Sequence, residues 1–435
     1  MQTLKVSPNR RFLMTEDGQP FFWMGDTAWE LFHRCTKEQI ELYLENRRQK
    51  KFNVIQAVVL AEEDGLRTPN EYGELPLHDL DPTRPNEAYF DVVDFTIQKA
   101  AEKGLYIGLL PTWGDKVVPM WGVGPVVFNP DNAEVFGRWL AQRYANFNNI
   151  IWILGGDRPI VSDKGGDKRE LWNRMAKGIR DVRTDWLMTY HTNGGRVQDS
   201  AATVVHQQPW PDLVMYQSGH GEAEAPTWKD AATLYALEPA KPFVDGEINY
   251  EDHPVARWPA WDPKDGYFRD HAVRKQLYRS VFAGGCGVTY GHHHVWQMWD
   301  YHRPAKNNGF ELRPWYDALD RPAAFEVKHL VDLMLSHPYF SRIPDPSLFL
   351  SGAGEAGTFC CATRDKHGEY AMIYIPEAGL TVELDLRSLQ KPYEVSLYDP
   401  RTGYTHPIEG QFTDEVFSFT SPVNGPDWIV LINKA

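Results

Sequence analysis

Short apolar runs recur along residues 1–338, and most of them end in a glycine, an acid or an aromatic residue. A run of about four to eight apolar residues bounded by glycine or proline is typical of a strand covered on both faces. The segments between these runs have helical periodicity, and Thr36 and Asn129 are suited to cap two of them. The predicted strands begin near Phe21, Phe52, Leu105, Ile150, Trp186, Asp212, Pro242 and Gly287.

Eight alternations of strand and helix predict an α/β protein whose main body is a (β/α)8 TIM barrel. Right-handed crossovers bring the carboxyl ends of parallel strands to one face, so the residues that follow the strands are expected to share one site. Turn signals before the first barrel strand predict a small hairpin over residues 1–22 that plugs the barrel. Further helices are expected over 87–103, 129–147, 168–183, 229–237, 270–282 and 315–335.

The pattern changes after a linker that three prolines mark between positions 338 and 346. Seven short runs of alternating polarity follow, with turns such as His367-Gly368 between them. Such runs predict an antiparallel β-sandwich, so the barrel occupies residues 1–338 and the sandwich residues 339–435. The pattern contains no evident exposed aromatic stripe. We therefore expect the sandwich to pack against the barrel rather than to bind a ligand.

The charge balance bears on partners. The chain of 435 residues carries 45 Lys and Arg against 59 Asp and Glu, a net charge of −14. A surface of this sign repels phosphate backbones and anionic lipids, so neither nucleic acid nor a membrane is an expected partner. There is no apolar run of about 18 residues and no apolar core of a signal peptide at the start. We expect a cytoplasmic protein from the chain as it stands, or a periplasmic or secreted one if a signal peptide was removed. The oligomeric state is not indicated.

The four cysteines are Cys35, Cys286, Cys360 and Cys361. They have neither the spacing of metal ligands nor that of a disulfide framework. This usage suits a reducing compartment, and no metal or organic cofactor is expected.

Aromatic residues are abundant, with 16 Trp, 20 Tyr and 21 Phe. Most of these rings must belong to the core. Aromatic faces also stack against the C–H faces of sugars, so rings that follow predicted strands are candidates for a carbohydrate site. Trp113 and Trp296 hold such positions, and one of the two could serve packing alone.

Polar residues follow the same strand ends. These residues are further candidates for substrate binding: Asp26, Thr27, Gln56, Asp115, His191, Tyr216 and His292. Asp26 could instead cap the first helix, and Tyr216 could be a core tyrosine bonded elsewhere. The segments 62–86 and 115–128 are too long for simple turns, so we expect them to form walls of the site.

Two carboxylates occupy strand ends that face each other across the barrel mouth. Asp157 follows the fourth strand after two glycines, and Glu247 follows the seventh strand. Glycoside cleavage uses a pair of this kind. A separation of about 5 to 5.5 Å fits a retaining mechanism, whereas about 6.5 to 9.5 Å fits an inverting one.

Three segments carry a resemblance to a known family: 25–29 (Gly-Asp-Thr-Ala-Trp), 152–158 (Trp-Ile-Leu-Gly-Gly-Asp-Arg) and 246–247 (Gly-Glu). They resemble the apiosidase-like barrels of glycoside hydrolase family 140, within the clan of retaining barrel glycosidases. The resemblance covers essentially the whole barrel. It implies that Asp157 is the acid/base and Glu247 the nucleophile.

The wider clan adds two expectations. Its tyrosine after the sixth strand implies that Tyr216 donates its hydroxyl to Glu247. The clan usually has Asn-Glu after the fourth strand, where this chain has Gly156-Asp157. Aspartate is one methylene shorter, and we expect the two glycines to bring it closer to the sugar. The C-terminal sandwich resembles the module, labelled collagen-binding by analogy, that often follows such barrels.

These observations predict a retaining glycoside hydrolase that cleaves a plant cell-wall glycan, of pectic, apiose-type or related structure, by double displacement. A retaining glycosidase with another substrate stays open as an alternative, either a pentofuranosidase or an endo-glucanase-like enzyme. Two other classes stay open as well: a barrel that binds carbohydrate without cleaving it, and a metal-dependent hydrolase that uses the histidines at 292–294. The metal barrels in question have a His-x-His pair on the first strand, where this chain has Gly25-Asp26-Thr27.

Overall fold

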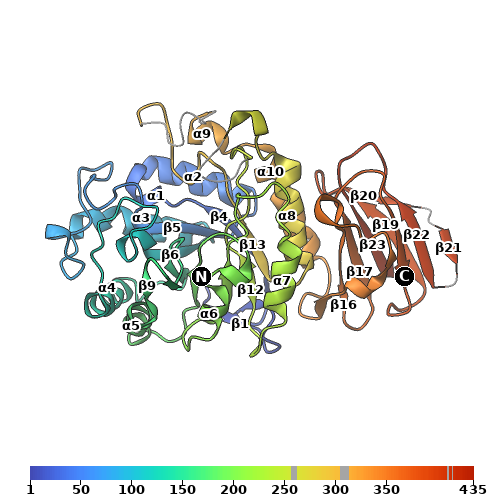
Figure 1. Ribbon diagram of the computed structural model, residues 1–435, viewed down its shortest axis with the longest axis horizontal. Helices are drawn as coiled ribbons and strands as arrows, with labels where there is room; N and C mark the ends of the chain where they lie inside the picture. The colour runs from blue at the N-terminus through green and yellow to red at the C-terminus, as the bar shows by residue number, and fades with distance from the viewer. Residues whose placement is uncertain (256–261, 304–312, 409–410, 414) are drawn as a thin grey trace.

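The structure is a computed structural model that describes residues 1–255, 262–303, 313–408, 411–413 and 415–435. Figure 1 shows two bodies side by side. The larger holds the N-terminus and has helices around a sheet, and the smaller is all β and holds the C-terminus.

Eight parallel strands form the larger body, each at a position where the sequence predicts one. Their order is β10-β7-β6-β5-β4-β13-β12-β11. The N–H of Asp212, just before β11, donates to the carbonyl of Met188 in β10 (2.9 Å), which joins the two ends of this order. The expected (β/α)8 barrel is therefore confirmed. The strands are β4 (Trp23–Thr27), β5 (Val54–Leu60), β6 (Tyr106–Thr112), β7 (Ile150–Gly155), β10 (Met188–His191), β11 (Val214–Tyr216), β12 (Phe243–Asp245) and β13 (Gly287–Tyr290).

The strand bodies are apolar because both of their faces are covered, by the barrel interior and by the helices. Every residue of β5, β6 and β7 is buried. The predicted cap at Thr36 is present, since its side chain accepts the N–H of Gln39 while the Gln39 side chain accepts the N–H of Thr36. The helices are α1 (Leu31–Arg34), α2 (Lys37–Gln49), α3 (Glu87–Glu102), α4 (Pro130–Arg143), α5 (Arg169–Arg180), α6 (Ala202–His206), α7 (Thr227–Tyr235), α8 (Asp270–Phe282), α9 (Trp315–Ala318) and α10 (Pro322–Leu335).

Two helical predictions differ from the structure. The single helix expected over 315–335 is split into α9 and α10, because Pro322 occupies the first turn of a new helix, where proline is favoured. The short helices α1 and α6 have no predicted counterpart, since four and five residues are too few to produce a helical period.

The N-terminal residues form a small antiparallel sheet of β1 (Leu4–Val6), β2 (Leu13–Thr15) and β3 (Pro20–Phe21). The hydroxyl of Tyr106, at the start of β6, donates to the carbonyl of Gln2 (2.7 Å), and Phe21 packs edge-on against the Tyr106 ring. The sheet therefore lies against the amino end of the barrel, away from the strand ends that carry the candidate site.

The smaller body is a sandwich of a six-stranded and a four-stranded antiparallel sheet around its own hydrophobic cluster. Besides the predicted runs, it contains three short strands at its edges, β14 (Arg342–Pro344), β20 (Thr405–Pro407) and β21 (Gln411–Thr413). The six-stranded sheet comprises β14 (Arg342–Pro344), β16 (Cys361–Asp365), β17 (Tyr370–Ile375), β23 (Trp428–Lys434), β19 (Tyr393–Tyr398) and β20 (Thr405–Pro407). The other comprises β15 (Phe349–Ser351), β18 (Thr381–Asp385), β22 (Val416–Thr420) and β21 (Gln411–Thr413).

The sandwich packs against α8, which stands between it and the barrel strands (Figure 1). Tyr278 of α8 stacks on Tyr374 of β17, with ring centroids 5.0 Å apart and 11° between the planes. Arg274 donates to both carboxylate oxygens of Asp427 (3.0 and 2.9 Å). One hydrophobic cluster contains residues of both bodies, for example Val288 of β13 together with Tyr374. A buried, charge-paired interface of this kind holds the two bodies together.

Within the part of the chain that the structure describes, no helix combines the length and apolar character needed to cross a membrane.

We predict that removal of everything after Leu335 gives an insoluble or inactive barrel, because the apolar face of α8 would be exposed and Arg274 would lose Asp427. The soluble yield and the activity of the truncated chain measure this. A subtler variant, Asp427→Leu, should lower the melting temperature of the full chain, since it leaves the buried Arg274 without this partner. A truncated chain that is soluble and fully active would contradict the prediction.

Candidate active site

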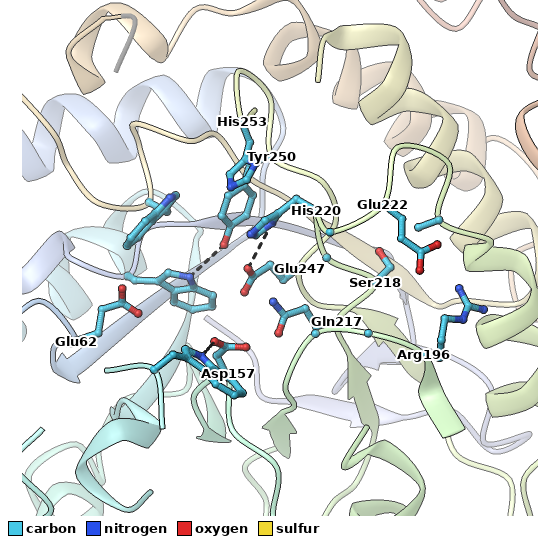
Figure 2. A pocket seen from close by; sticks show the side chains of 18 of the residues that line it. Glu62, Asp157, Arg196, Gln217, Ser218, His220, Glu222, Glu247, Tyr250 and His253 are labelled. Carbon is cyan, nitrogen blue, oxygen red and sulfur yellow. Dashed lines mark hydrogen bonds and ion pairs between the residues drawn. The ribbon is translucent and has the colours of Figure 1, made fainter. Parts of the chain in front are cut away.

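The carboxyl ends of the barrel strands open into a cavity of about 590 Å³. This volume lies in the range of about 300 to 1,000 Å³ that is usual for small-molecule sites. Figure 2 shows Asp157 and Glu247 pointing into it from different strands. The lining residues are Trp29, Glu62, Trp113, Trp121, Asp157, Gly194, Gly195, Arg196, Gln217, Ser218, Gly219, His220, Gly221, Glu222, Ala225, Glu247, Tyr250, His253 and Trp296.

Strand β7 delivers Asp157 through a tight left-handed turn. Gly155, Gly156 and Asp157 have φ values of 93°, 95° and 53°. A Cβ on Gly155 would lie 2.4 Å from the carbonyl oxygen of His191, and one on Gly156 would lie 2.7 Å from the backbone nitrogen of Gly114. Only glycine fits at both positions. The two glycines therefore let the chain turn in the narrow space between β6 and β10 and direct Asp157 into the cavity.

The Asp157 carboxyl is bonded on one of its oxygens. The indole Nε1 of Trp121 donates to Oδ2 (2.5 Å), and a guanidinium nitrogen of Arg158 lies 3.4 Å from the same atom. Burial raises the pKa of Asp157 to about 6. The negative charge of Glu247 adds to this rise, and the positive charge of Arg158 opposes it. The carboxyl can therefore carry a proton in the weakly acidic range and release it near neutrality.

Glu247 follows β12 through Gly246. The N–H of Gly246 donates to the carbonyl of Tyr216 (2.8 Å), and the Gly246 carbonyl accepts the side-chain amide of Gln56 (2.9 Å). Burial raises the pKa of Glu247 to about 8. Hydrogen bonding from Tyr250 and Gln217 counteracts this rise, whereas the charge of Glu62 adds to it.

His191, at the end of β10, connects the two acids. Its Nδ1 accepts the backbone N–H of Asp157 (3.1 Å), and its Nε2 lies 3.0 Å from Oε2 of Glu247. Burial lowers the pKa of His191 to about 4, so the imidazole is neutral at neutral pH. Because Nδ1 accepts a hydrogen bond, the ring proton of the neutral form resides on Nε2, although Nε2 and Oε2 of Glu247 are not aligned for a hydrogen bond.

Aromatic rings form much of the cavity wall. Trp29 packs against Trp113 and against His191, at centroid distances of 5.2 and 5.1 Å. The indole N–H of Trp29 donates to the hydroxyl of Tyr250 (3.2 Å), and Trp296 completes the set on the β13 side. Such rings suit the apolar faces of a sugar.

Four of the sequence-predicted residues line the cavity, namely Asp157, Glu247, Trp113 and Trp296. Three others support it from behind. Gln56 holds Gly246 as described, and His191 lies against both acids. Asp115 is fully buried, and its Oδ2 accepts the backbone N–H of Gly124 (2.8 Å), which fixes the segment that carries Trp121.

Asp26, Thr27 and His292 do not reach the cavity. The carboxylate of Asp26 accepts hydrogen bonds from Arg47 (2.6 Å) and Tyr43 (2.5 Å), and the hydroxyl of Thr27 donates to the Tyr290 carbonyl (3.2 Å). These two residues thus fasten β4 to α2 and β13, and neither lines the cavity.

The imidazole of His292 contacts Asp252 through Nε2 (3.3 Å) and accepts the N–H of His294 through Nδ1 (3.0 Å). Both of its nitrogens are engaged within the protein. No group of three or more potential ligands is arranged to hold a metal ion among the residues that the structure describes.

The expectation that Tyr216 donates to Glu247 is wrong. The Tyr216 hydroxyl lies 3.1 Å from Oγ of Ser280, on the outer side of β11. Tyr250, three residues after Glu247, is the tyrosine that hydrogen-bonds this carboxyl. The inward or outward direction of a side chain alternates along a strand, so a shift of one residue in the predicted strand end reverses it.

The segments 62–86 and 115–128 contribute Glu62 and Trp121 to the wall. Two further loops, 194–196 and 217–225, contribute much of the remainder and were not predicted. Their glycine-rich sequence, with His220 and Glu222, is the signal that could have marked them. His253 also lines the cavity and was not predicted, because it lies eight residues after the end of β12 at Asp245.

Comparisons with known proteins agree with this geometry. The family model described as "Apiosidase-like, catalytic domain" matches residues 7–341, and "Putative collagen-binding domain of a collagenase" matches residues 343–433. A solved structure described as "Glycoside hydrolase" has a TM-score of 0.89 at 31% identity, covering 100% of this chain and 97% of that one. A glycoside hydrolase family 5 structure from Bacteroides vulgatus ATCC 8482 has a TM-score of 0.88 at 31% identity, covering 99% and 93%. No curated protein matched the chain.

The barrel, the acids at its mouth and these likenesses define a glycoside hydrolase, an enzyme that acts on carbohydrate. Within that class, the chain belongs to the apiosidase-like family, with a collagen-binding-like β-sandwich after the barrel.

The raised pKa of Glu247 generates a stability prediction. The unfolded chain ionises this group above its usual pKa of 4.5, whereas the folded protein resists ionisation up to about pH 8. Folding is therefore increasingly disfavoured as the pH rises from 4.5 to 8. Glu247→Gln removes this penalty, so it should raise the melting temperature by at least about 2 °C at pH 8 and by less at pH 5.

Differential scanning calorimetry of Glu247→Gln at the two pH values measures this. Glu222→Gln is the matched control, because that carboxylate lines the same cavity but is exposed. A Glu247→Gln protein that is no more stable than the wild type at pH 8 would contradict the burial of an ionisable group at this position.

Proposed function

We propose that the protein is a retaining glycosidase of the apiosidase type, glycoside hydrolase family 140, that cleaves an apiose-containing or related plant cell-wall glycan. One observation carries the proposal. Carboxylates from the fourth and seventh strands, Asp157 and Glu247, face one cavity, and His191 contacts the main chain of the first residue and the carboxylate of the second. This is the placement of an acid/base and a nucleophile in retaining barrel enzymes.

In the first step, Asp157 gives its proton to the glycosidic oxygen as Glu247 attacks the anomeric carbon. The bond between that carbon and the leaving oxygen breaks, and a glycosyl ester forms on Glu247. In the second step, Asp157 takes a proton from water while the water oxygen displaces Glu247 from the anomeric carbon. The two inversions give net retention.

The proton must be on Asp157 when the first step begins. Burial favours the opposite order, because the pKa of Glu247 is raised to about 8 and that of Asp157 to about 6. The reactive form, with the proton on Asp157, is therefore the minor one at equilibrium, and the hydrogen bonds of Tyr250 and Gln217 to ionised Glu247 favour it. Positive charge at the anomeric carbon stabilises ionised Glu247 further, but only in the transition state. The apparent pKa values of the pH–activity profile therefore belong to the pair of acids rather than to either residue alone.

The charges of the cavity favour a neutral sugar as the released unit. Besides the two catalytic acids, Glu62 and Glu222 line it, and Arg196 is its single Arg or Lys among the described residues. The guanidinium of Arg196 lies 3.0 Å from the carboxylate of Asp230, so part of its charge is already balanced. An acidic site of this kind disfavours a uronate at the cleaved position and suits an uncharged pentose, as apiose is.

Incubation with pectic and arabinan-type glycans, followed by chromatography of the released monosaccharides, tests the proposed specificity. We predict that apiose is the main product and that Glu247→Gln releases it at least about 1,000-fold more slowly. Glu222→Gln, a cavity carboxylate outside the proposed pair, serves as control and should lose far less activity. Release of another sugar would contradict the specificity, and an unimpaired Glu247→Gln would contradict the mechanism.

A further inference from the structure

Trp121 is an exposed tryptophan whose only polar atom is bonded to the proposed acid. About 40% of its surface is accessible, yet its Nε1 lies 2.5 Å from Oδ2 of Asp157. It lines the cavity from the segment that follows β6. The direct bond between its single polar side-chain atom and the proposed acid, rather than its exposure, makes Trp121 a candidate for a role in the reaction.

The indole is held in place although it is exposed. The guanidinium of Arg158 lies over the ring at 4.4 Å from its centre and donates to the Trp121 carbonyl (2.9 Å). Asp115 lies behind the same segment, and a Cβ on Gly122 would meet the Asp115 Cβ at 2.3 Å. The segment thus packs so closely on a buried acid that Trp121 has a defined position.

The chemistry of the indole decides which oxygen of Asp157 can carry a proton. An indole N–H donates and cannot accept, and in a neutral carboxyl the carbonyl oxygen is a much better acceptor than the oxygen that carries the hydrogen. The second donor, Arg158, lies against the same Oδ2 at 3.4 Å. Among the described residues, no hydrogen bond to Oδ1 is formed by a side chain. With Trp121 in place, the proton of neutral Asp157 resides on Oδ1.

We propose that Trp121 is the positioning residue that selects Oδ1 of Asp157 as the proton-donating oxygen, and that its exposed ring bounds the place of the leaving group. This proposal rests on the proposed function, in which Asp157 is the acid/base. As the Oδ1–H bond breaks and the proton passes to the glycosidic oxygen, negative charge spreads over both oxygens of the carboxylate. The Trp121 hydrogen bond then becomes charge-assisted and stronger. A bond that strengthens during proton transfer accelerates it.

The first test needs no substrate. In protein labelled with 15N at the tryptophan indoles, one Nε1–H signal should titrate with the ionisation of Asp157 in the wild type. The same signal should be absent from the spectrum of Trp121→Phe. In Asp157→Asn it should be present but should lose the pH dependence that the Asp157 carboxyl causes in the wild type. The other groups that face Asp157, namely Arg158, His191 and Glu247, remain in both variants. If no indole signal depends on Asp157, the proposal fails whatever the enzyme cleaves.

The second test separates proton donation from packing. Trp121→Phe keeps a ring and removes the N–H. It should lower kcat by about 10-fold to 100-fold on methyl β-D-apiofuranoside, whose leaving group needs a proton, and by less than about 3-fold on the 2,4-dinitrophenyl glycoside, whose leaving group does not. Trp121→Ala should in addition raise KM for oligosaccharides, because the ring is lost.

Val123→Ala is the matched control on the same segment, since Val123 is exposed and lies outside the cavity lining. It should leave both substrates unaffected. Equal losses of Trp121→Phe on the two glycosides would overturn the proposal and leave Trp121 a packing role. A wild-type enzyme that cleaves neither glycoside would refute the proposed function instead, and the indole titration would still decide the contact between Trp121 and Asp157.

Discussion

The burial of two carboxyl groups beside one neutral imidazole is the constraint on which the rest of the site depends. Burial disfavours the charged form of each acid, which raises the pKa of both Asp157 and Glu247. His191 does not offset this with a positive charge, because burial lowers its own pKa. The imidazole instead positions the two residues: one nitrogen accepts the backbone N–H of Asp157, and the other lies beside the carboxyl of Glu247. Such a site is destabilising on its own, so a large core must supply the stability. The hydrophobic cluster that runs from the barrel into the sandwich meets this need.

The walls of the cavity are braced from two sides. Arg158 and Asp115 hold the segment of Trp121, and both are buried. The opposite wall, residues 217–225, is held through Glu224, whose carboxylate pairs with Lys275 and Arg279 of α8. Arg279 in turn donates to backbone carbonyls of the sandwich, including that of Gly357 (2.8 Å). The C-terminal body is thus connected to the wall of the site by one helix. This connection gives the sandwich a structural role in shaping the site.

Much of this architecture could be predicted from the sequence, and the limits have physical causes. The eight strands and the sandwich were predictable because strands covered on both faces must be apolar runs, and because turn residues mark their ends. Asp157 and Glu247 were predictable because they directly follow such runs. Tyr216 and Asp26 were misjudged, since a residue near a strand end can point into the barrel mouth or away from it, and only the three-dimensional path decides. Tyr250, His220 and Trp121 lie on loops whose paths depend on tertiary contacts such as the bond between Asp115 and Gly124.

The central claim is that Glu247 forms the glycosyl intermediate and Asp157 moves the proton. Rescue by azide tests both assignments in one experiment, because azide enters from the side of whichever carboxylate is missing. With 2,4-dinitrophenyl β-D-apiofuranoside, the account predicts that Glu247→Gly with azide yields the α-glycosyl azide, and that Asp157→Gly with azide yields the β-glycosyl azide. The configuration of each product is read by NMR. The reverse pairing of variant and product would contradict the account.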